Sequence, residues 1–186
     1  LRSVIHLYRA LDIYADWLVI PGTDEFFRVT KGFHNALQGA DFDLTDEVKD
    51  IYLMHSQAVA DLLKSHYDFI VVHDPQPAAV RKLHGRNGAR WVWRCHIDTS
   101  QANRQVLAFL NPFIAEYDAV VFTMEEFVPA DLRDQRFSII PPGIDPLSPK
   151  NMTVPMDLCR QIVEWFGVHL TQALITQVSR FDPWKD

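Results

Sequence analysis

A chain of 186 residues is long enough for one large α/β domain, or for one domain with part of a second. Hydrophobic residues make up 48% and charged residues 23%, which is the balance of a globular protein that buries a core. The formal net charge of -6 argues against a nucleic-acid binder, because such a protein needs a basic face. The sequence also lacks an uncharged run near the ~20 residues that a membrane span needs.

Two further features favour a cytoplasmic protein. The first 20 residues are interrupted by charges such as Arg2, Arg9 and Asp12, unlike the apolar core of a signal peptide. Cys95 and Cys159 fit neither a metal-ligand spacing nor a small disulfide framework, so we expect free thiols in a reducing compartment. We therefore expect a cytoplasmic protein with no membrane partner and no nucleic-acid partner.

The first third of the chain has a helical character. Apolar residues at helical spacing predict a helix over 1–13, and no capping sequence precedes it. A short strand is predicted over 15–20. Thr23 can cap the next helix, which should end at Gly39. A long amphipathic helix is then expected over 48–63.

Apolar runs typical of strands alternate with helical segments through the middle of the chain. A helix capped by Thr99 or Ser100, with a bend at Pro112, separates two of them. The predicted strands are Phe69 to Val72, which we expect to be buried, and Trp91 to Arg94, Ala119 to Thr123 and Ser138 to Ile140. This alternation predicts an α/β fold with a parallel, doubly wound sheet.

A proline-rich polar stretch from Pro146 to Pro155 has the composition of a linker between domains. We therefore predict one domain over 1–145 and part of another over 146–186. Beyond the linker, a helix should begin at Pro155 and a strand should follow over 173–178.

Polar side chains follow two of the predicted strands at the point where each strand ends. They are His73, Asp74 and Gln76 after the first, and Arg94, His96 and Asp98 after the second. Open α/β sheets bind ligands at the carboxyl ends of their strands, and these groups suit sugar hydroxyls. An ordinary Asp-Pro turn, a structural histidine, and an ion pair between Arg94 and Asp98 are the competing explanations.

Two basic residues near the last predicted strand suit a phosphate group. Arg180 can form paired bonds to phosphate oxygens, and Lys185 adds a second positive charge. Two solvated basic residues are the alternative on charge pattern alone. Trp184, next to Lys185, is a candidate for stacking on a sugar. The histidines make no metal motif, so we expect no metal. No pair of carboxylates indicates a glycosidase.

Four motifs in this order carry a family resemblance: HDPQPAA at 73–79, WVWRCHIDTS at 91–100, IIPPGIDPLSPKN at 139–151 and ALITQVSRFDPWKD at 173–186. They resemble the retaining, nucleotide-sugar-dependent trehalose synthases of glycosyltransferase family 4. The resemblance implies a GT-B fold, with two facing Rossmann-like domains. On this reading, 1–145 is most of the N-terminal acceptor-side domain, its beginning missing, and 146–186 is the start of the C-terminal donor-binding domain.

The resemblance also implies a reaction and roles for residues. Glucose from an NDP-glucose, such as ADP-glucose or UDP-glucose, would be transferred to glucose to form α,α-trehalose, without a cofactor. Arg180 and Lys185 would bind the donor diphosphate, and His96 would lie beside the donor sugar as a third catalytic residue. His73, Asp74, Gln76, Arg94 and Asp98 would complete the sugar-binding set, together with His96.

Other functions stay open at this point. A trehalose phosphorylase of the same fold is the nearest alternative enzyme. A non-catalytic sugar-binding or assembly module derived from such an enzyme is an alternative of another class. Apolar surface on an incomplete second domain would also favour a homodimer.

Overall fold

A parallel sheet of four strands organises the structure, a computed structural model that describes residues 2–64, 66–86, 88–134, 136–146, 148–171 and 173–178. The strands are β1 (Phe69–His73), β2 (Arg90–Arg94), β3 (Ala119–Phe122) and β4 (Phe137–Ile139). Contacts divide the chain into two units, Leu1–Pro142 and Gly143–Asp186, and each is described by itself.

The helices of the first unit lie close to their predicted positions. Thr23 caps α2 as expected, because its hydroxyl accepts a hydrogen bond from the Phe26 amide at 3.1 Å. Thr45 caps α3 in the same way. The α-helices are α1 (Arg2–Ala10), α2 (Asp24–Ala36), α3 (Asp46–Leu62), α4 (Val80–His84) and α5 (Arg104–Ile114), and the 3-10 turns are η1 (Glu125–Phe127) and η2 (Ala130–Leu132).

The strands follow one another in the order β1-β2-β3-β4, and each pair is parallel. Because parallel neighbours need a crossover connection, α4 and α5 link β1 to β2 and β2 to β3. The predicted α/β fold is confirmed: a Rossmann-like parallel sheet flanked by helices. Among the described strands, the order does not reverse as it would at the centre of a doubly wound sheet.

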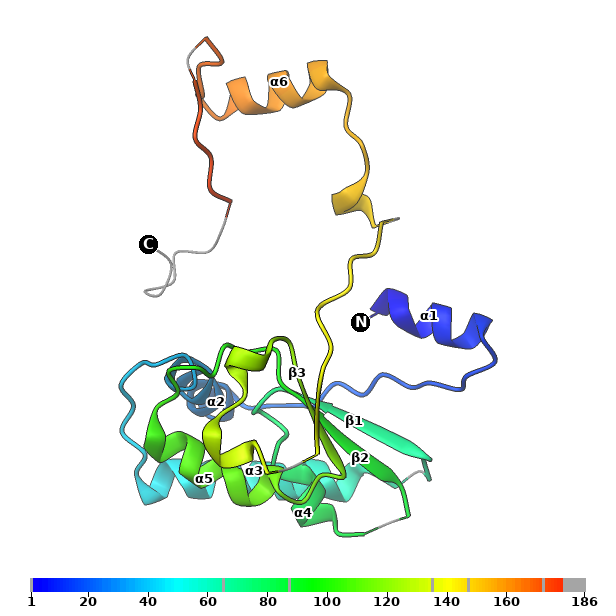
Figure 1. Cartoon of the computed structure of the whole chain (residues 1–186), viewed down its shortest axis with the longest axis vertical. Coiled ribbons are helices and arrows are strands. Elements are labelled where there is room, and N and C mark those ends of the chain that lie inside the picture. Colours follow the sequence, from blue (N-terminus) through cyan, green and yellow to red (C-terminus); the bar gives the residue numbers. More distant parts are fainter. Residues whose placement is uncertain are drawn as a thin grey trace. The chain divides into compact units, whose positions relative to one another are not determined.

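One face of this sheet forms the core. Side chains alternate along a strand, and the register places Val72 beside Trp93 and Ile70 beside Trp91 on the same face. Both tryptophans are fully buried there. Helices α3, α4 and α5 lie together along this side of the sheet (Figure 1).

The prediction that the strand from Phe69 to Val72 is buried was wrong. The side chains of Phe69 and Val71 are 69% and 52% exposed, whereas Val72 is buried. The physical reason is that side chains alternate along a strand, so Phe69 and Val71 lie on the face of β1 opposite the core, whereas Val72 lies on the core face. A continuous apolar run predicts a strand, but it does not show whether both faces of that strand are covered.

Two further expectations about elements were wrong. Residues 15–20 form no strand and run as irregular backbone, with Val19 73% exposed. A β-prone sequence becomes a strand only where a partner strand receives its hydrogen bonds.

The cap of α5 is Asn103, whose side chain accepts bonds from the Gln105 and Val106 amides. Thr99 instead donates its hydroxyl to the Phe127 carbonyl. Pro112 does lie inside the helix.

The second unit contains η3 (Pro149–Asn151) and α6 (Met156–Trp165). Pro155 precedes this helix as predicted, and Gly167 follows it with a positive φ of 78°. The strand expected over 173–178 is not formed; these residues are irregular, and the side chain of Ile175 is fully exposed. Whether this unit begins a second Rossmann-like domain, and whether it drives dimer formation, stay predictions.

Across the ranges that the structure covers, no helix combines the length and the apolar character needed to cross a membrane. The two cysteines are free, and Cys95 is buried beside β2. Burial raises the pKa of the Cys95 thiol to about 12, so this thiol stays protonated at neutral pH.

Candidate functional site

The carboxyl ends of β1 and β2 bring four of the predicted site residues together. The parallel register pairs His73 with Arg94, so the residues that follow each strand meet at the same edge of the sheet. We name the group formed by His73, Asp74, Arg94 and His96 the strand-end cluster. His73 and Asp74 precede Arg94 and His96 by about twenty residues in sequence, and the parallel pairing of β1 with β2 makes them neighbours.

A hydrogen bond joins the two imidazoles of this cluster. Nδ1 of His73 lies 2.8 Å from Nε2 of His96. His73 is half-buried, whereas the His96 side chain is exposed. The bond therefore lies at the surface, at the carboxyl ends of β1 and β2, where a ligand can reach it.

Asp74 has a backbone conformation that is uncommon for a residue with a side chain. Its φ is 65°, in the left-handed region, which Asp tolerates better than most residues. Three hydrogen bonds hold it there: its amide donates to the Arg94 carbonyl at 2.8 Å, its carbonyl accepts from Nε1 of Trp93 at 2.9 Å, and its carboxylate Oδ1 accepts from the His96 amide at 2.9 Å. The carboxylate is thus fixed between β1 and β2.

Arg94 joins the ends of three strands. Its guanidinium donates to the Phe122 carbonyl at 3.0 Å, to the Ile140 carbonyl at 2.6 Å and to the Thr123 hydroxyl at 3.5 Å. The side chain is 7% exposed, so its charge is buried and is satisfied by neutral oxygen atoms. This arrangement ties β2 to β3 and to the end of β4 beside the two histidines.

Burial is the main cause that lowers the pKa of both histidines. The other imidazole and Arg94 lower the pKa of His73 further, and Arg94 lowers the pKa of His96, whereas Asp74 opposes the change in each. Both rings are therefore neutral at pH 7. A neutral imidazole has one donor and one acceptor, which is what a sugar hydroxyl requires.

Two buried tyrosines hold the loop that follows Asp74 of the cluster, and sequence reasoning missed both. Tyr52 on α3 donates its hydroxyl to the Pro75 carbonyl at 2.8 Å and accepts from the Ala79 amide at 3.2 Å. Tyr117 donates to the Ala78 carbonyl at 2.9 Å. A tyrosine among the apolar positions of a buried helix face needs a partner for its hydroxyl, and that requirement was the available signal.

The remaining predicted site residues are placed differently. Asp98 accepts hydrogen bonds from the amide and hydroxyl of Ser100, so its carboxylate serves the local turn. The alternative of an ion pair between Arg94 and Asp98 was wrong, because Arg94 bonds to strand-end oxygens instead. Gln76 is half-buried in the loop after β1. Arg180, Trp184 and Lys185 lie outside the described residues, so their roles stay predictions.

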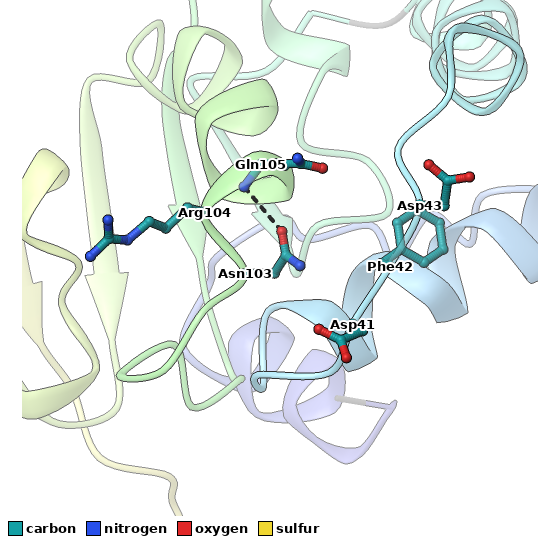
Figure 2. Close-up of a pocket in the computed structure, with 6 residues that line it drawn as sticks. All are labelled: Asp41, Phe42, Asp43, Asn103, Arg104 and Gln105. Carbon is teal, nitrogen blue, oxygen red and sulfur yellow. Dashed lines mark hydrogen bonds between the residues drawn. The ribbon is translucent and has the colours of Figure 1, made fainter.

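A separate depression of about 570 Å³ lies beside the start of α5. Figure 2 shows the chain after α2 on one side of it and the first residues of α5 on the other, with the Arg104 side chain directed away. Its lining residues are Asp41, Phe42, Asp43, Asn103, Arg104 and Gln105. None of the predicted site residues is among them, so we place the candidate site at the strand-end cluster, where fixed polar groups converge.

In the part of the chain that the structure describes, no three His, Cys, Asp or Glu side chains are arranged to hold a metal ion. The available chemistry is hydrogen bonding by two neutral imidazoles and one carboxylate, beside a buried cation. These groups can orient hydroxyls and polarise their protons.

A parallel α/β sheet with polar groups gathered at the carboxyl ends of its strands defines a ligand-binding domain of the Rossmann-like class. The chain belongs to the trehalose synthase family: the family model described as "Trehalose synthase, N-terminal domain" matches residues 1–129.

Individual relatives agree with this assignment. The chain is 49% identical over 191 residues to a trehalose synthase of Rubrobacter xylanophilus, covering 100% of this chain and 46% of the relative. It is 44% identical over 187 residues to a trehalose synthase of Thermococcus litoralis, covering 100% of this chain and 45% of the relative. A trehalose phosphorylase of Pleurotus pulmonarius is 26% identical over 219 residues, covering 99% of this chain and 29% of the relative. The chain therefore spans less than half the length of these trehalose synthases.

Proposed function

We propose that this chain is the acceptor-side part of a retaining glycosyltransferase that transfers glucose from an NDP-glucose to glucose and so forms α,α-trehalose. One observation carries the proposal: in a chain of the trehalose synthase family, the strand-end cluster fixes a carboxylate and two neutral imidazoles at one edge of the sheet. This edge is where parallel α/β sheets bind ligands.

The chemistry of glycosyl transfer suits these groups. The acceptor hydroxyl must be aimed at the anomeric carbon, and as the new bond forms its proton must pass to a base, for which the Asp74 carboxylate and an oxygen of the leaving diphosphate are the available groups. The Asp74 carboxylate already accepts one amide bond, and a carboxylate has lone pairs for about four hydrogen bonds, so it can also accept from a sugar hydroxyl. His96 would lie beside the donor sugar.

The leaving diphosphate needs positive charge as the glycosidic bond breaks. Arg180 and Lys185 are our candidates for that role, because a guanidinium forms paired bonds to phosphate oxygens and an ammonium adds a point charge. ADP-glucose and UDP-glucose are the donors to test, and no cofactor is proposed.

Proton NMR of a full-length protein that carries this chain tests the proposal. Incubated with glucose and ADP-glucose or UDP-glucose, the protein should produce the anomeric signal of α,α-trehalose. The variant Asp74→Asn, which keeps the size of the side chain but removes its charge, should lower turnover by about a hundredfold or more. Arg180→Ala should lower it comparably. Undiminished turnover in both variants, or no trehalose from either donor, would contradict the proposal.

A trehalose phosphorylase is the second candidate, because a protein of that name matches 99% of this chain at 26% identity. The two reactions differ in what they consume. The same NMR assay, started from trehalose and inorganic phosphate, would then show glucose 1-phosphate, and added nucleotide sugar would have no effect. A non-catalytic module would instead bind glucose or trehalose and turn over neither mixture.

A further inference from the structure

The two histidines of the strand-end cluster share a bond of particular geometry. Nδ1 of His73 and Nε2 of His96 are 2.8 Å apart, the ring centres are 5.1 Å apart, and the ring planes differ by 11°. The distance between the ring centres is close to the N–N distance plus one ring radius at each end. The two ring centres and the two bonded nitrogens therefore lie nearly on one straight line. The rings therefore lie edge to edge near a common plane, which is the geometry of a straight N–H···N hydrogen bond and not of a face-to-face stack.

This bond couples the tautomers of the two rings. Each neutral imidazole carries one N–H, and the shared bond uses one nitrogen of each ring. If His73 Nδ1 donates, His73 Nε2 is an acceptor and His96 Nδ1 carries a proton. If His96 Nε2 donates, both assignments reverse. The two outer nitrogens therefore always present one donor and one acceptor.

The surroundings keep the pair neutral and in place. The backbone of His96 is held by its amide bond to Asp74 Oδ1, and His73 lies opposite Arg94 in the register of β1 and β2. The buried Arg94 cation and partial burial oppose a charge on either ring, whereas the Asp74 carboxylate favours one. If both rings took up a proton, both facing nitrogens would be donors and the bond would be lost.

We propose that His73 is a positioning residue for His96: its Nδ1 fixes the ring of His96 and couples the tautomer of that ring to its own. The identity of that ligand, a sugar hydroxyl, rests on the proposed function. A hydroxyl both donates and accepts, so the coupled pair can match it in either tautomer, which a freely rotating histidine does not guarantee.

Three variants of His73 separate positioning from simple packing. In His73→Asn the side-chain amide can occupy the place of Nδ1, so the bond to His96 can be kept. In His73→Gln the amide corresponds to Nε2, and in His73→Phe the ring is kept without any nitrogen; neither can replace the bond. Amide spectra of each variant report whether it is folded, and His96→Gln assigns the His96 ring signals.

The first readout is the ring nitrogen NMR spectrum of full-length protein with labelled histidine. We expect His73→Phe and His73→Gln to shift His96 toward the tautomer mixture of a free imidazole, and His73→Asn to keep the parent spectrum. An unchanged His96 spectrum in His73→Phe, or a changed one in His73→Asn, overturns the proposal.

The second readout is turnover, which separates this inference from the proposed function. Misaligning His96 should lower kcat about ten- to a hundredfold in His73→Phe, with KM for glucose changed far less, and His73→Asn should recover most of kcat. If the parent protein makes no trehalose but the tautomers respond as expected, the proposed function fails and the positioning role stands. If it makes trehalose and His73→Phe turns over normally, the positioning role fails.

Discussion

At the scale of single residues, Arg94 is the group on which the cluster depends for its shape. Its guanidinium binds oxygen atoms at the ends of β3 and β4, so the position of β2 relative to both strands is fixed where His96 leaves the sheet. A buried cation bonded to carbonyls is costly to replace, because the Ile140 carbonyl loses its bond from Arg94 and the Phe122 carbonyl keeps only its bond from the Ile140 amide.

We therefore expect Arg94→Met to lower the free energy of unfolding by about 2 to 4 kcal/mol, measured by urea denaturation. The matched control is Arg90→Met on the same strand. The Arg90 side chain is 71% exposed and pairs with Asp118 at 3.0 Å at the surface, so its removal should cost about 0 to 1 kcal/mol. Equal losses in the two variants would show that the strand-end bonds of Arg94 do not stabilise the sheet.

At the scale of elements, α3 contacts the loop after β1 through the hydroxyl group of one tyrosine. Tyr52 is fully buried, and its hydroxyl bonds to both Pro75 and Ala79, at the two ends of the turn that carries Gln76. The helix thereby fixes the loop that follows Asp74.

Replacing this residue, Tyr52→Phe, should lower the free energy of unfolding by about 1 to 3 kcal/mol, since the buried Ala79 amide loses its bond to the hydroxyl and the Pro75 carbonyl keeps only its bond from the Ala78 amide. Hydrogen exchange at the Ala79 amide should become faster. Tyr67→Phe is the control, because the Tyr67 hydroxyl donates to the exposed Asp16 at 3.1 Å and its loss should cost little. Unchanged exchange at Ala79 would mean that the turn is held by other contacts.

The sequence was informative where local chemistry decides the structure. The Thr23 cap, the helices and the four strands of the sheet followed from periodicity and capping residues, and polar groups at strand ends indicated the candidate site. The strands expected over 15–20 and 173–178 did not form, because strand propensity gives no information about a partner.

The geometry of the cluster could not be predicted in the same way. That His73 bonds to His96, and that Arg94 bonds to carbonyls of β3 and β4 rather than to Asp98, depends on the register between strands. The positive φ of Asp74 is equally a product of three contacts that are distant in sequence. Residue types indicated which chemistry was available, and the pairing of strands decided which groups meet.

At the scale of the whole molecule, the buried core that the described residues form belongs to one unit. Its buried apolar cluster runs from Phe26 to Leu132, inside Leu1–Pro142. A chain that ends at Pro142 should therefore unfold in one cooperative thermal transition, followed by circular dichroism. A chain that ends at Asp118 is the control and should show none, since it lacks β3, β4 and core residues such as Phe122. A Pro142 chain without a transition would show that the second unit is needed for folding.

The order of the strands has a consequence for how this protein acquires its shape. Each strand of the sheet pairs with the strand made just before it, so every closure joins segments that are near in sequence. Short closures lose little chain entropy and favour rapid folding. During synthesis the sheet can grow in one direction, with each new strand docking on an edge that already exists. The two histidines can then meet once β2 docks on β1, whereas Arg94 can bond to the Phe122 and Ile140 carbonyls only after β3 and β4 have docked.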